Sequence, residues 1–133
     1  MMEGIKEKKL VVYTDSRGWL AEIFRPEDVK KTMNGQVTIT TAHPGIIKAN
    51  HYHTRKYEWY CVISGKMRLA LKDMKTGKKE EITLSEDDLK ILEICPNIAH
   101  GFKNIGEGVL LVLMYIDEPF DKNDPDTFAE VVI

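Results

Sequence analysis

Short apolar or alternating segments, separated by turns, fill most of this 133-residue chain. Residues 66–71 (K-M-R-L-A-L) alternate strictly, which predicts a strand with Met67, Leu69 and Leu71 on one face. Residues 109–116 (V-L-L-V-L-M-Y-I) form an unbroken apolar run, which is typical of a central strand. The other predicted strands are residues 9–13, 19–24, 36–41, 58–64, 80–84, 89–95 and, at a sheet edge, 128–133.

Turns separate these segments at spacings of roughly 8–12 residues, and little of the sequence has a helical period. Turn-forming residues gather at residues 15–18, 43–45, 73–79 and 96–97. Residues 26–33 (P-E-D-V-K-K-T-M) are expected to form one short helical turn. The pattern therefore predicts an all-β fold, in which two sheets close as a jelly-roll barrel around a pocket.

Composition narrows the class of protein. Apolar residues make up 43% of the chain and charged residues 30%, which is typical of a globular domain and favours one domain over residues 1–133. A formal net charge of −2 provides no basic field for nucleic acid. No apolar run reaches the ~18 residues that span a membrane, and the charged N-terminal residues do not resemble a signal peptide.

The two cysteines point to a reducing compartment. Cys61 and Cys95 are far apart and do not form a C-x-x-C pair. We therefore expect free thiols in a cytoplasmic protein, with Cys61 in the core of its strand; a single disulfide is the alternative.

The candidate chemistry lies in residues 45–65. His51 and His53 are two positions apart, so both imidazoles point to the same face if this segment is extended. Glu58 from the next strand is placed to join them, and His100 follows much later in C-P-N-I-A-H-G-F. Three imidazoles and one carboxylate suit a divalent metal such as Zn, Mn, Ni or Fe. An H-x-H pair alone is a weak signal, because most histidines are structural or lie at the surface.

The spacing around these histidines resembles a known motif. Between Gly45 and Gly65 the chain reads G-x5-H-x-H-x4-E-x6-G, which matches the first motif of the cupin family at every fixed position. The resemblance implies a double-stranded β-helix, the cupin jelly-roll barrel. It also implies that a metal is held by His51, His53, Glu58 and His100.

The second cupin motif, P-x-G-x-x-H-x3-N, is matched more loosely. Cys95, Asn97, His100 and Asn104 occupy its fixed positions, and Pro96 lies beside the expected proline. Asn97 replaces the glycine of a turn, which is acceptable because asparagine adopts left-handed conformations more readily than most residues.

Two further segments resemble one branch of the cupins. Residues 15–22 (D-S-R-G-W-L-A-E) resemble a segment of the RmlC-like nucleotide-sugar 3,5-epimerases, the dTDP-4-dehydrorhamnose epimerase type, and residues 99–104 (A-H-G-F-K-N) resemble another. Over nearly the whole chain, the sequence resembles the C-terminal cupin domain of CapF-type capsular polysaccharide proteins, including the F-D-x-x-x-P-D-T tail at residues 120–127. The resemblance implies epimerisation next to the 4-keto group of a nucleotide-linked 6-deoxysugar, in surface polysaccharide biosynthesis.

The resemblance also implies catalytic roles. His51 falls on the general base of the rhamnose branch, and His100 matches in both branches. A base of this kind removes the proton next to the ketone, and an acid returns a proton on the other face. Tyr115 is the candidate acid, with a core tyrosine as the alternative. His53 and Glu58 replace a glutamine and a lysine of the rhamnose branch, and both changes favour metal binding.

The implied partners follow from the same alignment. Arg17 and Glu22 fall on positions that contact the nucleotide across a dimer interface in the rhamnose branch. Lys48 either meets the diphosphate of the substrate or is a solvated lysine. The resemblance thus implies a nucleotide-sugar substrate and a homodimer. Because the chain lacks a dinucleotide-binding motif, any redox step would need a separate reductase.

Two other classes of function stay open. Metal-dependent dioxygenases and sugar-phosphate isomerases use the same four ligands, although they have no need for the Arg17 turn. A non-catalytic cupin that binds a sugar is the third possibility.

Overall fold

In a computed structural model that describes residues 1–30 and 34–133, the alternating segments form strands and no described residue lies in a helix. The first sheet has the order β1 (Ile5–Lys9), β9 (Lys90–Ile94), β6 (Glu58–Ser64), β11 (Leu110–Ile116) and β4 (Gln36–Ala42). The second sheet has the order β12 (Phe128–Ala129), β5 (Ile47–Tyr52), β10 (Ile98–Asn104), β7 (Lys66–Asp73) and β8 (Lys79–Ser85). A separate hairpin consists of β2 (Tyr13–Asp15) and β3 (Gly18–Leu20).

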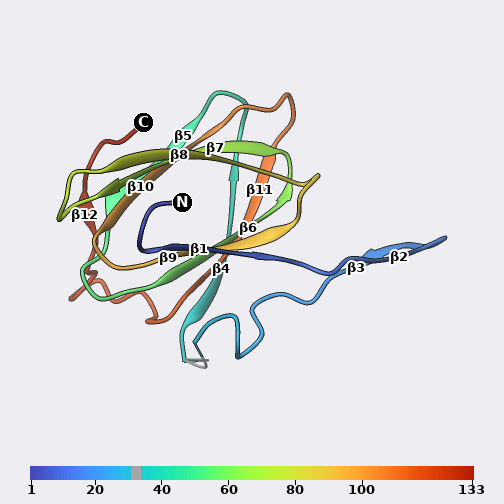
Figure 1. The fold of residues 1–133 in the computed structure, drawn as a ribbon, viewed down its shortest axis with the longest axis horizontal. Helices are drawn as coiled ribbons and strands as arrows, with labels where there is room; N and C mark the ends of the chain where they lie inside the picture. The colour runs from blue at the N-terminus through green and yellow to red at the C-terminus, as the bar shows by residue number, and fades with distance from the viewer. Residues whose placement is uncertain (31–33) are drawn as a thin grey trace.

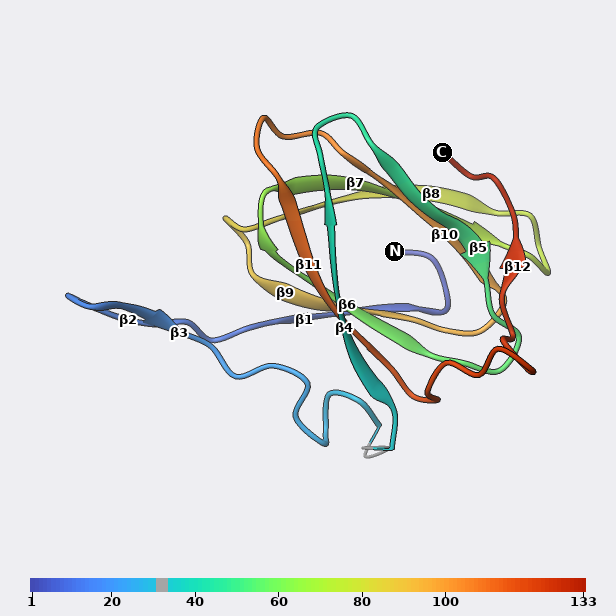
Figure 2. The same cartoon turned by 180° about the vertical axis from the view of Figure 1, so that it is seen from behind.

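The two five-stranded sheets face each other and close into a jelly-roll barrel (Figures 1 and 2). This confirms the predicted all-β fold. Met67, Leu69 and Leu71, which the alternation places on one face of β7, are buried between the sheets with Leu92 and Val112. Burial of these apolar side chains is the main favourable contribution to the stability of such a barrel.

Several strand ends differ from the prediction. The strand expected at residues 9–13 is divided, because β1 ends at Lys9 and β2 begins at Tyr13. The edge strand expected at residues 128–133 contains only Phe128–Ala129, which pairs with β5. Residues 26–30 form a turn in which the Val29 amide donates to the Arg25 carbonyl (3.2 Å). Residues 31–33 of the expected helical turn lie outside the described residues.

The hairpin β2–β3 projects away from the barrel (Figures 1 and 2). Trp19 at its end is 54% exposed, and Leu20 is exposed as well. The strand predicted at residues 19–24 stops at Leu20, where the pairing of β3 with β2 ends, and among the described residues no third strand continues this ladder.

The predictions of free cysteines and of no membrane-spanning segment can be compared with the structure. Cys61 is fully buried and Cys95 half-buried, and both are free, as expected. Among the described residues there is no helix with the length and apolar character needed to cross a bilayer.

Candidate metal centre and pocket

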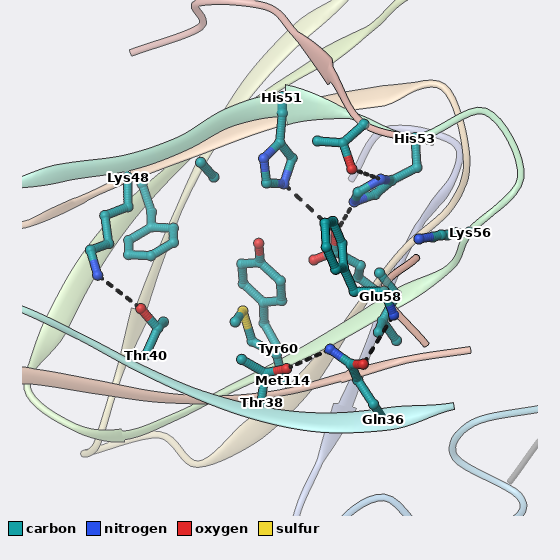
Figure 3. A pocket seen from close by; sticks show the side chains of 15 residues that line it. Gln36, Thr38, Thr40, Lys48, His51, His53, Lys56, Glu58, Tyr60 and Met114 are labelled. Atoms are coloured by element: carbon teal, nitrogen blue, oxygen red, sulfur yellow. Dashed lines mark hydrogen bonds and ion pairs between the residues drawn. The ribbon is translucent and has the colours of Figure 1, made fainter. Parts of the chain in front are cut away.

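Four side chains meet inside the barrel, from three different strands and the loop after β5. His51 lies on β5, His53 follows it, Glu58 begins β6 and His100 lies on β10. Their candidate ligand atoms all lie within 4.8 Å of one another. Glu58 Oε1 is 3.7 Å from His51 Nε2 and accepts a hydrogen bond from His53 Nε2 (Figure 3). It also lies 3.6 Å from His100 Nε2. The structure thus brings together the four residues that the sequence selected as metal ligands.

A local irregularity in the second sheet places two of these histidines. His51 lies opposite His100 in the register of β5 and β10, and the register shifts between His100 and Gly101. Ala49 and Asn50 take left-handed conformations beside this bulge, with φ of 69° and 55°. Such a bulge turns the strand and redirects the side chains that follow it.

Hydrogen bonds to the backbone hold two of the imidazoles in place. His100 Nδ1 donates to the Ile98 carbonyl (2.9 Å), and His53 Nδ1 donates to the Asp126 carbonyl (2.6 Å). A histidine that donates through Nδ1 presents Nε2 to a metal, and such outer contacts fix the orientation of a ligand.

The loop before β12 supports this arrangement. Asp126 has a φ of 45°, and its carboxylate accepts hydrogen bonds from the Thr54 amide (2.9 Å), the Thr54 hydroxyl (2.5 Å) and the Arg55 amide (2.9 Å). Burial alone would raise the pKa of Asp126, but these hydrogen bonds lower it to about 2. The tail motif at residues 120–127 therefore fastens the loop that carries His53.

The donor atoms of the cluster fit a cation. His51 Nε2 and His100 Nε2 are buried, and neither has a hydrogen-bond partner among the described residues. Buried polar atoms without partners are uncommon because they lose their hydration without compensation. A divalent cation bound by three imidazoles and a carboxylate would satisfy both nitrogens.

The charges of the cluster also suit a metal. Burial would raise the pKa of Glu58, but the charge of His100 and the close approach of the three imidazoles hold it well below its usual value. Burial lowers the pKa of His51 despite its contact with Glu58. Burial would also lower the pKa of His53, but the contact with Glu58 has the larger effect, and the pKa of His53 is raised. The carboxylate is therefore ionised, and a metal ion would compete with the proton for His53 Nε2.

His51, His53 and Glu58 of the cluster form one wall of a cavity of about 270 Å³. Gln36, Thr38 and Thr40 of β4 contribute polar groups on the opposite side (Figure 3). Met114 and Phe102 add apolar surface. A pocket of this kind can hold a small ligand with both polar and apolar faces beside the four ligand residues.

Lys48 is the one predicted substrate-binding residue that lines this cavity in the described part of the chain. Its ammonium donates to Thr40 Oγ1 (3.1 Å). Arg17 lies on the projecting hairpin and pairs with Asp15, and Glu22 pairs with Arg25 (3.1 Å) outside the barrel. The structure therefore does not bring Arg17 or Glu22 to the pocket of their own subunit.

Tyr115, the predicted acid, lies outside the pocket. Met114 and Ile116 on either side of it line the cavity, so Tyr115 faces the opposite side of β11. There it packs against Trp59 and Phe24, and its hydroxyl accepts a hydrogen bond from the Gly35 amide (2.8 Å). This position agrees with the alternative interpretation of Tyr115 as a core tyrosine with a packing role.

Tyr60 is the tyrosine that lines the pocket. Its ring meets the ring of His100 edge-on, with centroids 5.7 Å apart. Burial and the neighbouring charge of Glu58 raise the pKa of Tyr60 well above its usual value, so the hydroxyl keeps its proton. The sequence contains a signal for this residue, because Glu58 and Tyr60 are two apart on one strand and share a face.

The fold and the site together define an RmlC-like cupin. The family described as the polysaccharide biosynthesis C-terminal domain matches residues 13–128, and the chain belongs to this family.

Two curated relatives are similar in sequence. The UDP-2-acetamido-2,6-beta-L-arabino-hexul-4-ose reductase of Pseudomonas aeruginosa is 33% identical over 118 residues, which cover 89% of this chain and 30% of that protein. The spore coat polysaccharide biosynthesis protein SpsL of Bacillus subtilis is 29% identical over 131 residues, which cover 95% of this chain and 87% of that protein. The chain thus corresponds to less than a third of the reductase and to most of SpsL.

Solved structures agree with the family. The capsular polysaccharide assembling protein CapF of Staphylococcus aureus matches with a TM-score of 0.70 and 33% identity, over 92% of this chain and 34% of CapF. The dTDP-4-dehydrorhamnose 3,5-epimerase of Sulfolobus tokodaii matches with a TM-score of 0.81 and 25% identity, over 96% of this chain and 77% of that one. The chain therefore has the fold of sugar-nucleotide epimerases, within a family of polysaccharide biosynthesis.

Proposed function

We propose that this protein is a metal-dependent epimerase or isomerase that acts next to the ketone of a nucleotide-linked 4-keto-6-deoxysugar. The observation that carries the proposal is the cluster of His51, His53, Glu58 and His100, with two unpartnered buried nitrogens, in a pocket of an RmlC-like barrel. The family and the epimerase and reductase names of its relatives support the substrate class.

The proposed reaction removes a proton from one face of a carbon next to the ketone and adds a proton to the other face. A base removes the hydrogen at the carbon next to the ketone, the electron pair forms an enolate, and an acid returns a proton to the other face. His51, His53, Glu58 and His100 would hold the divalent cation, which when bound stabilises negative charge on the ketone oxygen. Tyr60 holds its phenolic proton in the pocket and is the donor that the geometry favours over Tyr115.

Two roles compete for His51. Its side chain is 27% exposed, whereas those of His53 and His100 are buried, so His51 is the imidazole most open to the pocket. Its lowered pKa keeps it neutral and able to accept a proton. A nitrogen that ligates a cation cannot accept a proton at the same time. Metal analysis of His51→Ala decides between the roles: a base leaves bound metal intact, and a ligand does not.

Proton exchange tests the function itself. The purified protein is loaded with Zn, Mn, Ni or Fe and incubated in deuterated water with UDP- or dTDP-linked 4-keto-6-deoxysugars. We expect deuterium at C3 or C5, and loss of the label with Glu58→Gln. Metal-loaded protein that incorporates no deuterium into any sugar of the panel contradicts the proposal.

The hairpin supports a homodimer. Tyr13, Trp19 and Leu20 expose large apolar surfaces on an element that projects from the barrel, and burial against a second copy would remove them from water. In such a pair Arg17 would be free to contribute to the partner's pocket. Sedimentation at micromolar concentration should give a dimer, and Trp19→Ser should shift it to monomer.

The reductase relative also supports a separate reductase as a partner in the same route.

A further inference from the structure

Lys56 is a buried lysine that the proposed reaction has not used. The residue is 2% exposed, although it lies in the short loop between β5 and β6. Its ammonium donates to the Pro125 carbonyl (3.0 Å). Asp117 interacts with its charge, but in the described part of the chain no carboxylate forms a direct ion pair with it.

Burial of an ammonium under these conditions is costly. Lysine is almost never fully buried unless it is paired, because removal of the charge from water is not repaid by a single carbonyl. An ammonium has three N–H donors, and one of them is used by Pro125. Two donors therefore remain for another acceptor.

The position of Lys56 shows where that acceptor would be. Lys56 lines the same cavity as His51, His53 and Glu58, and Figure 3 shows its ammonium directed toward the cluster. Lys48, the other lysine of the cavity, lies on the far side of the histidines (Figure 3). The pocket thus has one cationic side chain on each side of the metal-ligand cluster.

We propose that Lys56 binds an anionic oxygen of the ligand beside the metal centre. The chemical class is a small oxyanion, a carboxylate or an enolate oxygen, because only a localised negative charge repays the burial of this ammonium. The proposal rests on the proposed function in one respect: in the epimerase, this oxygen is the former ketone oxygen, which becomes negative when the neighbouring proton leaves. Lys56 then stabilises charge that develops during the reaction and would act mainly on kcat.

A structural role makes the opposite prediction about stability. If Lys56 only ties the tail to the barrel through Pro125, Lys56→Met should lower the melting temperature and leave ligand affinity unchanged. If Lys56 is an anion site, methionine of similar shape removes a buried charge that lacks a direct ion pair, so the melting temperature should stay or rise while anion binding falls. Lys56→Arg keeps the charge and should retain part of the binding.

Oxalate is the probe, because it is a planar dianion that presents carboxylate oxygens to both a cation and an ammonium. Calorimetric titration is done on wild type, Lys56→Met, Lys56→Arg and the control Lys72→Met, each with Zn and without added metal. Lys72 is half-buried outside this cavity and pairs with Glu130 (2.8 Å). We expect Lys56→Met to weaken oxalate binding at least tenfold, Lys56→Arg to weaken it less, and Lys72→Met to leave it unchanged, with zinc affinity retained throughout.

Equal oxalate affinity in wild type and Lys56→Met, or no oxalate binding by wild type, overturns the anion site. Deuterium exchange on the same variants separates this proposal from the proposed function. Exchange that survives in Lys56→Met with unchanged kcat leaves the epimerase in place and removes Lys56 from it. Oxalate binding that depends on Lys56, together with no exchange on any sugar, leaves the anion site in place and removes the epimerase.

Discussion

Glu58 supplies the negative charge of the four-residue cluster that we propose as a metal site. It contacts all three imidazoles and stays ionised in spite of its burial. Glu58→Gln keeps the shape of the side chain but removes its charge. We expect the affinity for Zn²⁺ to fall by more than the ~10–100-fold that loss of an outer-shell contact causes, because a direct ligand is lost. Competition with a chromogenic chelator measures this.

A matched control lies on the other sheet, outside the cavity. Glu81→Gln removes an exposed carboxylate of β8 that pairs with Arg68 (3.8 Å). It should leave zinc affinity unchanged. Equal zinc affinity in Glu58→Gln and wild type would remove Glu58 from the ligand set.

Individual residues also show what the sequence was able to predict. Asn97 adopts the left-handed conformation expected of it, with φ of 65°, because the second motif places it where a turn needs such a residue. The sequence does not show which residues of β11 face the pocket, because every residue from 109 to 116 is apolar or aromatic. Tyr115 therefore fits the pattern on either face of the strand. The packing partners on the outer face decide it, and they come from distant segments such as β6 and residues 23–24.

At the scale of elements, strands with clear alternation were predicted and irregular ones were not. β7 alternates and is found within two residues of its predicted ends. β5 carries His51, but its two left-handed residues break the period of two, so no strand pattern appears in I-K-A-N-H-Y. The convergence of the four side chains could still be predicted, because they follow a spacing motif rather than a strand pattern.

The bulge between β5 and β10, which interrupts the alternation of β5, depends on a glycine. A Cβ on Gly101 would overlap Asn50 Oδ1 and lie 2.9 Å from Ile133 Cγ2. Asn50 Oδ1 accepts hydrogen bonds from the Val132 and Ile133 amides (2.9 and 3.3 Å), so it holds the C-terminal residues on the barrel.

Gly101→Ala should displace Asn50 and release these residues. We expect a loss of about 1–3 kcal/mol in the free energy of unfolding, the usual cost of overpacking. Faster hydrogen exchange at the Val132 and Ile133 amides should accompany it. Gly108→Ala is the control, because a Cβ there meets nothing within 4 Å and should leave both measurements unchanged. Retained protection of the two amides in Gly101→Ala would show that Asn50 does not depend on this glycine.

At the scale of the whole molecule, the cluster joins parts of the barrel that are distant in sequence. Its four side chains come from β5 and the loop after it, from β6 and from β10, and so from both sheets. A cation held by all of them therefore acts as a cross-link between the sheets. Because the complete site exists only in the folded chain, metal binding should stabilise the native state.

The size of this effect follows from mass action. With free Zn²⁺ at 1,000 times its Kd, the gain is about 4 kcal/mol, which for a domain of this length raises the melting temperature by roughly 10 °C or more. Calorimetric melts of wild type with Zn²⁺ and with excess chelator should differ by this amount. Glu58→Gln should show a much smaller difference, because its cluster lacks the charged ligand. Equal melting temperatures of wild type with Zn²⁺ and with chelator would mean that the four side chains do not bind zinc. In that case His51 Nε2 and His100 Nε2 would stay without a partner in the presence of zinc.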